Sequence, residues 1–337
     1  MNQRDIARIA GVSTATVSRV INQKGNVDRD TYAKVLKVIE EQGYVPNTIA
    51  KSLRVRQTKT IGFVIPDIGN PFFPEVLKGV ESVCVQHGYN IILGNTNEDV
   101  ETERSVVRNL RQQRVDGLLM ILVDERGETL RWGLRGAEGR FPIVFIDRHI
   151  KGFQYDSVVI DNEGGAFQAT DYLLRLGHRR IAMIHGPVTM TPGGGRLRGY
   201  LEAMRAWGVE VVAEYVREGD FRTKSGYELA KHLMSLPVPP TAIFGGNNLM
   251  TMGIFEALRD MGIAVPDQVS LVGFDDFLLG AYLSPPLTVV DRPMSDMGRI
   301  AAELLISRIE NRDQTAVRKV VLPTALRIRQ SCREPQS

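Results

Sequence analysis

The sequence contains very little cysteine and no long apolar segment. Cys84 and Cys332, the two cysteines of the 337-residue chain, lie far apart, so no disulfide framework is indicated and a reducing compartment fits. No apolar run approaches the ~18 residues that a membrane-spanning helix requires. The first residues, MNQRD, lead into an amphipathic pattern without the apolar stretch or cleavage site of a signal peptide. We therefore expect a cytoplasmic protein with no membrane segment.

Motifs of the common enzyme classes are also missing. The five histidines are scattered, and none pairs with a cysteine or a carboxylate at the spacing of metal ligands. The chain has no phosphate-binding GxxxxGKS or GxxxxGKT motif and no GxGxxG that follows a strand. The glycines at 193–195 indicate a loop, with weak support for a phosphate cradle. We expect no catalytic residue, no metal and no cofactor, and therefore no enzyme.

What the chain does have is an uneven charge. Residues 1–60 carry eleven Lys and Arg against five Asp and Glu, a net charge of +6, whereas the remaining residues carry 31 against 34, a net charge of −3. A basic head on an acidic body is typical of a nucleic-acid-binding module joined to a regulatory domain. A solvated charged surface is the alternative that charge alone leaves open.

Residues 2–45 predict three short helices. Asn2 can cap the first as part of a capping box, Ser13 can cap the second over 14–22, and Asp28 can cap the third. Gly11 allows a sharp turn between the first two helices. The apolar residues recur at helical spacing, so each helix has one face for a common core.

The first two of these helices predict a helix-turn-helix. The outward face of the second would carry short hydroxyls, a methyl, a guanidinium and an amide, which suit base edges and phosphates in a major groove. These side chains belong to Thr14, Ala15, Thr16, Ser18, Arg19 and Asn22. A generic helical hairpin is the structural alternative, but the basic charge and the pattern together favour DNA binding.

From residue 61 onward, short apolar runs alternate with amphipathic helical segments. This alternation predicts an α/β fold with doubly wound parallel sheets, and the number of runs favours two lobes. The apolar runs are 61–66, 90–94, 115–122, 142–146, 157–160, 180–184, 242–246 and 269–274. The helical patterns are near 74–88, 101–113, 163–177, 197–208, 223–236, 249–262 and 294–310.

Several apolar runs end in a hydrogen-bonding residue, where open α/β sheets bind their ligands. These residues are Asp67, Asn95, Asp147, Asn247 and Asp275. Carboxylates and amides that face a common cleft suit a polyhydroxyl ligand, because each can bridge neighbouring hydroxyls. For any single residue, a cap on the following helix is an equal alternative.

Many segments of the chain resemble the LacI/GalR repressor family. They include AGVS at 10–13, TVSRVIN at 16–22, GYVPN at 43–47, AKSL at 50–53, NPFF at 70–73, RVDGL at 114–118, LGH at 176–178, RLRGY at 196–200 and VGFDD at 272–276. The resemblance covers nearly the whole chain. It implies a helix-turn-helix head (1–46), a hinge helix or linker (47–59), a two-lobed periplasmic-binding-protein-like core (60–330) and a tail (331–337). Lobe 1 would take about 60–160 and 290–320, and lobe 2 about 162–289 and 321–330.

The resemblance also implies roles in DNA binding. Thr14 and Ala15 match the positions that vary with the operator, and both are small, so Arg19 is the favoured base reader, bidentate to guanine. The residues that match phosphate-gripping positions are Ser13, Thr16, Ser18, Asn22, Tyr44 and Asn47.

The basic stretch 47–56 matches the family's hinge helix, which enters the minor groove as a pair from two subunits. Leu53 matches a leucine wedged between base pairs, with Ala50 packed beside it and Arg54 adjacent. An ordinary core leucine is the alternative for Leu53. A helix of about ten residues is marginal in water, so it can fold on DNA and loosen off it.

For the effector, the resemblance selects Asp147, Arg196, Asn247 and Asp275 as contacts. Phe72 and Phe73 match a wall of the first lobe, and Phe221 matches an aromatic residue that stacks on the ligand. Two departures from the family pattern concern charge. Asn248 stands where the family usually has Asp, and Arg148 follows Asp147. Both could favour an anionic sugar acid or sugar phosphate, and a neutral pentose or hexose stays equally open.

The resemblance predicts a homodimeric repressor of a catabolic operon that binds double-stranded operator DNA. Induction, in which a small sugar or sugar-derived effector releases the DNA, is favoured over corepression by a sugar phosphate, a purine or a phosphocarrier protein. A transport-type solute-binding protein is the remote alternative, because it would account for the core but not for the head.

Overall fold

The computed structural model describes residues 1–22, 25–44, 57–133, 141–150, 155–311 and 316–336. The chain forms two compact units, Met1–Thr58 and Lys59–Ser337, which are described separately. Residues 45–56, which contain most of the predicted hinge, lie outside the described residues. None of the helices in the described ranges is both long and apolar enough to cross a membrane.

The first unit contains the three predicted helices, α1 (Gln3–Ala10), α2 (Thr14–Ile21) and α3 (Arg29–Glu41). The predicted capping box is confirmed: Asn2 accepts from the backbone N of Arg4 and Asp5, and the Asp5 carboxylate accepts from the Asn2 backbone N at 2.9 Å. Gly11 lies in the left-handed region with φ 64°, which allows the chain to turn directly into α2. The helices bury a small apolar core that consists of Ile6, Ala7, Ala10, Val17, Val20, Val35 and Val38.

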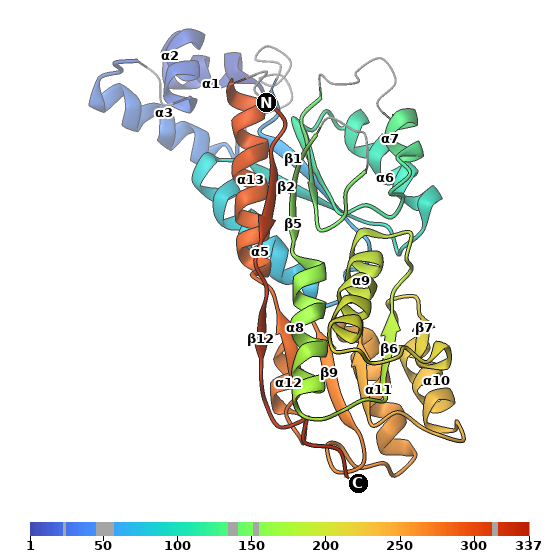
Figure 1. The fold of residues 1–337 in the computed structure, drawn as a ribbon. Coiled ribbons are helices and arrows are strands. Elements are labelled where there is room, and N and C mark those ends of the chain that lie inside the picture. Colours follow the sequence, from blue (N-terminus) through green and yellow to red (C-terminus); the bar gives the residue numbers. More distant parts are fainter. Residues whose placement is uncertain (23–24, 45–56, 134–140, 151–154, 312–315, 337) are drawn as a thin grey trace. The chain divides into compact units, whose positions relative to one another are not determined.

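The second unit has two lobes, each built on a twisted sheet (Figure 1). In the described part of lobe 1 the strand order is β11-β5-β4-β3-β1-β2, and all paired strands are parallel. The strands are β1 (Thr60–Ile65), β2 (Asn90–Asn95), β3 (Gly117–Met120), β4 (Ile143–Ile146), β5 (Asp156–Ile160) and β11 (Lys319–Leu322). Helices α5 (Phe72–His87) and α13 (Met294–Asn311) cover one face, and α6 (Val100–Gln112) and α7 (Glu128–Gly133) cover the other.

Helices α5 and α13 pack with almost no space between their backbones. A Cβ atom on Gly79 would lie 1.9 Å from the Ser295 carbonyl oxygen, and one on Gly298 would lie 2.0 Å from the Val76 carbonyl oxygen. Both contacts are far below van der Waals separation with backbone atoms, so only glycine permits this helix crossing.

Lobe 2 repeats the architecture with the strand order β12-β10-β9-β8-β6-β7 in its described part. Its strands are β6 (Ile181–His185), β7 (Val216–Glu218), β8 (Ala242–Gly245), β9 (Ser270–Phe274), β10 (Thr288–Asp291) and β12 (Ala325–Arg327). Its helical elements are α8 (Asn162–Arg175), α9 (Thr191–Ala206), η1 (Ala213–Tyr215), α10 (Thr223–Met234), α11 (Asn248–Asp260) and α12 (Leu278–Tyr282). The chain passes between the lobes after β5, after β10 and between β11 and β12.

The structure differs from the sequence prediction in several elements. Strand β12 runs antiparallel to β10, so lobe 2 is not purely parallel. Strands β7, β10, β11 and β12 and helices α7 and α12 were not predicted. Each of the four strands contains a charged residue, so none forms a continuous apolar run, and the two helices are too short for a helical period to show. In segment 331–337, which the sequence analysis assigned to a tail, Ser331 is fully buried and its hydroxyl donates to the Leu271 carbonyl at 2.6 Å.

The loop predicted at 193–195 is wrong, because these glycines lie inside α9. Their physical role is close packing rather than flexibility. A Cβ atom on Gly193 would lie 2.2 Å from the Pro187 carbonyl oxygen, and one on Gly195 would lie 2.9 Å from Asn162 Cβ. Helix α9 therefore begins at Thr191, several residues before the expected start, and brings Arg196 close to the lobe boundary.

Candidate functional site

The predicted DNA-reading helix presents the expected side chains. Thr14, Ala15 and Arg19 are exposed along α2, while Val17 and Val20 on its opposite side are buried. Ser13 caps the helix: its hydroxyl accepts from the Thr16 backbone N at 3.1 Å and lies 2.9 Å from Thr16 Oγ1. The cap fixes the direction in which α2 leaves the turn.

Other predicted DNA contacts also have structural roles within the head. Asn22 caps the C-terminal end of α2, and its Nδ2 donates to the Ser18 carbonyl at 2.7 Å. Tyr44 is half-buried against the helical core. The remaining predicted contacts, Asn47, Ala50, Leu53 and Arg54, lie outside the described residues.

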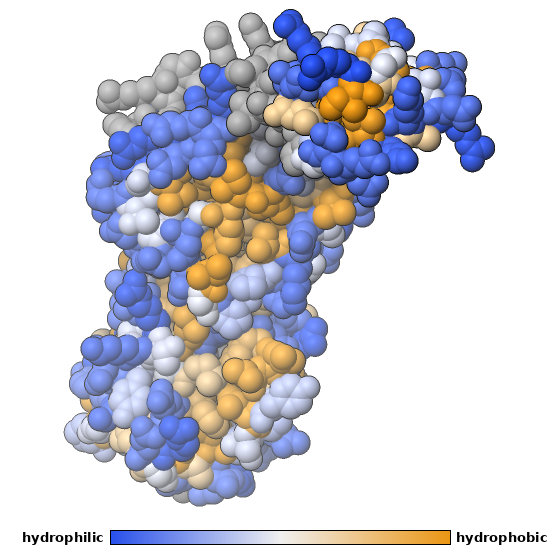
Figure 2. Space-filling view, turned by 180° about the vertical axis from the view of Figure 1, so that it is seen from behind, coloured by the Kyte–Doolittle hydropathy of each residue, from blue (hydrophilic) through white to orange (hydrophobic). Residues whose placement is uncertain are grey.

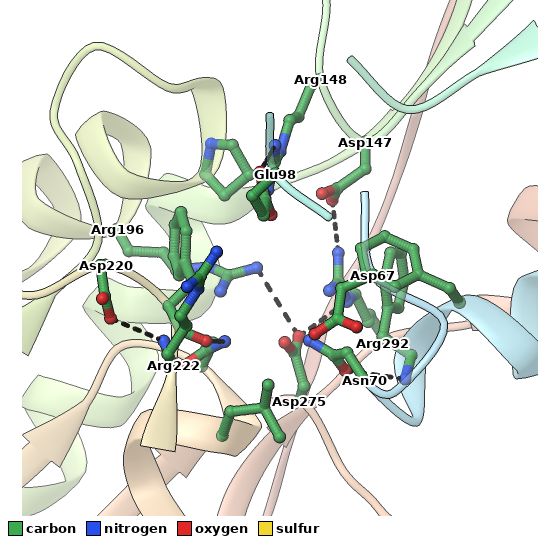
Figure 3. Close-up of a pocket in the computed structure, with 16 residues that line it drawn as sticks. Asp67, Asn70, Glu98, Asp147, Arg148, Arg196, Asp220, Arg222, Asp275 and Arg292 are labelled. Carbon is green, nitrogen blue, oxygen red and sulfur yellow. Dashed lines mark hydrogen bonds and ion pairs between the residues drawn. The ribbon is translucent and has the colours of Figure 1, made fainter. Parts of the chain in front are cut away.

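A cavity between the two lobes forms the second candidate site (Figure 3). The space between its walls is about 470 Å³, which includes open solvent at the mouth. Its walls consist of Asp67, Asn70, Phe72, Phe73, Glu98, Asp147, Arg148, Pro192, Arg196, Asp220, Phe221, Arg222, Asn247, Leu249, Asp275 and Arg292. The residues that the family resemblance selected for the effector all line this one cavity, namely Phe72, Phe73, Asp147, Arg196, Phe221, Asn247 and Asp275, and so does Arg148.

The carboxyl ends of parallel strands supply much of the lining, as the strand-end argument expected. Asp147 follows β4, Asn247 follows β8 and Asp275 follows β9. Asn95 does not line the cavity; it accepts a hydrogen bond from the Ile68 backbone N at 2.9 Å and thereby shapes a neighbouring loop. Asn247 combines both alternatives, because it lines the cavity and also caps α11 through the Met250 backbone N at 2.9 Å.

The backbone around the cavity is strained. Four of its residues have left-handed φ values without being glycine: Glu98 at 56°, Asp147 at 63°, Phe221 at 66° and Asp275 at 74°. Such a conformation is uncommon for residues with a Cβ atom, and for a bulky aromatic residue it is costly. Strain of this kind concentrates at ligand-binding sites, where the surrounding structure holds side chains in place.

The centre of the cavity contains a residue that the sequence reasoning missed. The Arg292 guanidinium forms ion pairs with Asp147, which follows β4 of lobe 1, and with Asp275, which follows β9 of lobe 2; its Nε lies 2.7 Å from Asp275 Oδ1. It also lies 3.6 Å above the Phe72 ring centroid. All three charged side chains are at most 7% exposed. Figure 3 shows Arg292 between the two carboxylates.

Arg196, on α9 of lobe 2, approaches the Asp275 carboxylate. Its Nε donates to Asn162 Oδ1 at 2.9 Å and its Nη1 to the Gly246 carbonyl at 2.6 Å. Its Nη2 lies 3.6 Å from Asp275 Oδ1 and donates no hydrogen bond to the described residues. Burial of the guanidinium lowers the pKa of Arg196 to about 10. Because Arg196 Nη2 is buried in the cavity wall without an acceptor among the described residues, an oxygen atom of a ligand can accept its hydrogen bond.

Arg148 also faces the cavity, but its charge is neutralised. Its guanidinium binds both carboxylate oxygens of Glu98, at 2.9 and 2.7 Å, and Nη1 donates to the Leu122 carbonyl at 2.8 Å. The expectation that Arg148 adds a positive charge for an anionic ligand loses this support, because the paired carboxylate cancels that charge.

Direct contacts join the two lobes around the cavity. Asn248 Nδ2 in lobe 2 donates to Asn70 Oδ1 in lobe 1 at 2.9 Å, and both side chains are buried. Arg222 Nη2 reaches the Asn97 carbonyl at 3.3 Å. Because residues of both lobes line the cavity, its shape depends on how closely these contacts hold the lobes together. Within the described ranges, the His, Cys, Asp and Glu residues form no group suited to a metal ion.

Comparison with known proteins gives consistent matches for both units. The family of bacterial regulatory proteins of the lacI type matches residues 3–47, and the periplasmic binding protein-like domain matches residues 170–332. The ribose operon repressor of Escherichia coli K12 is 38% identical over 309 residues, covering 91% of this chain and 92% of the relative. The transcriptional repressor PurR of Edwardsiella ictaluri is 38% identical over 315 residues, covering 93% and 92%.

Among solved structures, a lac repressor dimer bound to operator and the anti-inducer ONPF matches with a TM-score of 0.86 and 27% identity, over 98% of both chains. The fold agreement thus extends over head and core alike.

Proposed function

Because the chain belongs to the lacI family of bacterial regulatory proteins, we propose that it represses a catabolic operon and leaves its operator when a small sugar or sugar-derived effector binds the interlobe cavity. At the level of the family, it is a DNA-binding transcriptional repressor controlled by a small molecule and not an enzyme. The operon type, the effector class and release by the effector are our proposals.

The observation that carries the effector proposal is the composition of the cavity. Two buried carboxylates, Asp147 and Asp275, lie beside buried guanidiniums, and Arg196 Nη2 has a donor to spare. Hydroxyl groups can donate to the carboxylates and accept from Nη2 at the same time. One relative of this chain is named as a ribose operon repressor, and this name supports a sugar as the effector.

For DNA binding, the exposed face of α2 supports the assigned contacts. Arg19, Thr14 and Ala15 are free to meet base edges, whereas Ser13, Thr16, Ser18, Asn22 and Tyr44 are proposed to orient the helix against phosphates. On the family resemblance, we propose Leu53 as the minor-groove wedge, with Ala50 packed beside it and Arg54 adjacent in the sequence, and Asn47 as a further phosphate contact.

We also propose that the protein acts as a homodimer in the cytoplasm, attached to the nucleoid through DNA. The solved lac repressor dimer supports the assembly. Large apolar side chains are exposed on α12, with Leu278 at 75%, Leu279 at 63% and Tyr282 at 78%. Figure 2 shows one face of the core, on which apolar residues also gather. A second copy of the chain would remove such surface from water.

Fluorescence anisotropy with the protein's own promoter DNA tests this function. Neutral pentoses and hexoses, sugar phosphates, purines and a phosphocarrier protein would each be added to the preformed complex. We expect a neutral sugar to release the DNA. Tighter DNA binding with a purine or with the phosphocarrier protein would establish corepression instead, and the absence of any preferred duplex would overturn the repressor assignment.

A further inference from the structure

Asp147 and Asp275 come from different lobes, yet both form ion pairs with the same guanidinium. Arg292 follows β10, at a point where the chain passes from lobe 2 back to lobe 1. The side chains of Arg292 and of the two aspartates are each at least 93% buried. Two like charges in such a place repel strongly, because little water screens them. Arg292 supplies the positive charge that lets the lobes approach.

We propose that Arg292 is a specificity-determining residue of the effector cavity: its guanidinium occupies the position between Asp147 and Asp275 that a cationic group of a ligand would otherwise take. The cavity then accepts neutral polyhydroxyl compounds and rejects their aminated counterparts. This inference rests on the proposed function, because it concerns the effector of the same cavity.

The exclusion of amines follows from the placement of the charges. Asp147 and Asp275 are the buried carboxylates that could compensate a ligand ammonium at the centre of the cavity, and both already form ion pairs with Arg292. An ammonium group that enters would lie near Arg292 and near Arg196, which also approaches Asp275. Asp67 and Asp220 also line the cavity, but they are half-buried and exposed respectively, so neither supplies a buried counter-ion at this position. A buried cation without a buried counter-ion is strongly unfavourable, so the amine must either lose its proton or stay in water.

Anionic ligands gain no net attraction either. The cavity is lined by five carboxylates (Asp67, Glu98, Asp147, Asp220 and Asp275) and by four guanidiniums (Arg148, Arg196, Arg222 and Arg292). Five negative and four positive charges leave a net charge of −1. Glu98 holds Arg148 bidentately, so that cation is not available to a ligand anion. This electrostatic balance favours a neutral effector over a sugar acid or a sugar phosphate.

Arg292 also covers one ring of the aromatic wall of the cavity. Its guanidinium lies 3.6 Å above the Phe72 ring centroid, where the apolar face of a sugar ring could otherwise stack. The same contact orients the guanidinium toward the two aspartates, so the residue is held by an aromatic ring as well as by charge. Phe73 and Phe221 are the other phenylalanines that line the cavity.

A first experiment tests the internal counter-ion without any effector. Arg292→Ala removes the guanidinium and leaves a space of its size between Asp147 and Asp275. Low-millimolar guanidinium chloride, far below denaturing concentrations, should raise the melting temperature of this variant above its value in sodium chloride of equal ionic strength. Wild type and Arg299→Ala, which alters an exposed arginine on α13, should show no such rise. If guanidinium gives no specific stabilisation of Arg292→Ala, the counter-ion role is wrong.

A second experiment tests selectivity, using calorimetric titration of full-length protein. D-ribose would be compared with 3-amino-3-deoxy-D-ribose, and D-glucose with D-glucosamine. For whichever neutral parent binds wild type, we expect the amine to bind about 100-fold more weakly. Arg292→Gln should reduce or reverse this ratio, and Arg292→Lys, which keeps the charge, should preserve it. Equal ratios in wild type and Arg292→Gln would overturn the proposal.

The two experiments also separate this inference from the proposed function. Guanidinium rescue does not depend on operator binding or on the identity of the effector. If rescue occurs but no sugar alters DNA binding, the counter-ion role holds and induction by a sugar fails. If a neutral sugar releases the operator and its amine does so equally well, the proposed function holds and the specificity role of Arg292 fails.

Discussion

Glu125 of lobe 1 caps a helix of lobe 2: its carboxylate accepts from the Thr191 backbone N at 2.7 Å and from the Thr191 hydroxyl. Thr191 is the first residue of α9, and the cap residue of that helix, Met190, offers no side-chain hydrogen bond. The negative carboxylate thus satisfies a donor at the positive end of the helix dipole. The contact exists only while the lobes are close together, so it connects the closure of the cavity to the charge of one side chain.

This contact predicts a pH dependence of effector binding. Burial raises the pKa of Glu125, with the neighbouring Asp147 acting in the same direction and Arg148 and Thr191 opposing it. The closed form therefore binds a proton more tightly than a form in which Glu125 meets water. Closure should strengthen as the pH falls through the raised pKa toward the ordinary pKa of a glutamate, and it should lose this contribution as the pH rises through the raised pKa, with at most a roughly tenfold change in affinity per pH unit. Calorimetry in buffers of different ionisation enthalpy would measure the proton uptake.

Glu125→Gln should flatten this dependence, because the amide keeps an acceptor for the Thr191 backbone N but carries no charge. Glu128→Gln, at an exposed glutamate three residues further along, serves as the matched control and should leave the dependence intact. His149 Nδ1 lies 3.4 Å from Thr191 Oγ1, so this imidazole is a second ionisable side chain at the same contact. If His149→Gln removes the pH dependence while Glu125→Gln retains it, the assignment to Glu125 is incorrect.

A cavity residue could be predicted from the sequence only where the residues next to it in the chain reveal its position. Asp147 and Asp275 directly follow strands that are buried along their whole length and almost entirely apolar (IVFI and SLVGF), so apolar runs that end in a carboxylate identify them in the sequence. Arg292 follows β10 (TVVD), which begins and ends with a polar residue, so no continuous apolar run precedes it. Its partner Asp147 is 145 positions away, and no periodicity records a contact at that separation. The missed residue is therefore the one whose role depends entirely on tertiary structure.

The glycines at 193–195 show the opposite error. Local propensity indicates a loop, because glycine in a helix costs about 1 kcal/mol relative to alanine. The close approach of Gly193 to the Pro187 carbonyl, and of Gly195 to Asn162, outweighs that cost by allowing α9 to pack where no side chain fits. In the head the local signals and the fold agree, and the caps of all three helices follow from Asn2, Ser13 and Asp28.

The cap on the DNA-reading helix predicts a measurable loss of stability. Ser13→Ala removes the acceptor for the Thr16 backbone N and should destabilise α2 by about 1 kcal/mol. Hydrogen–deuterium exchange of the full-length protein would show this as roughly fivefold faster exchange of the first amides of α2. Ser13→Asp, which restores an acceptor, should recover the protection, and Thr14→Ala should leave it unchanged. Equal exchange in Ser13→Ala and wild type would contradict the capping role.

Arg19 is expected to read bases rather than to add charge alone. Arg19→Ala should relax the preference for one base pair of the operator, because a bidentate contact contributes about 1–3 kcal/mol of discrimination. Lys37→Ala removes an equal charge from the exposed surface of α3 and should leave the preference unchanged. Measuring the binding of each protein to a set of single-base operator variants at several salt concentrations would distinguish base reading by Arg19 from a contribution of its charge alone. A loss that is uniform over all variants, with a reduced salt slope, would identify Arg19 as a phosphate contact instead.

Leu53 offers the sharpest separation of DNA binding from effector binding. An apolar side chain wedged between base pairs unstacks them and bends the duplex, and the bend brings more of the protein onto the DNA. Leu53→Ala should therefore weaken operator binding on the order of 10- to 100-fold and reduce the bend measured by energy transfer between dyes at the DNA ends. Lys51→Ala, which removes a charge from the same segment, should weaken binding without changing the bend angle of the bound fraction. Effector affinity should be nearly unchanged in both variants, because the cavity is formed by residues 67–292. A Leu53→Ala protein that has lost effector binding would show instead that this leucine belongs to the core.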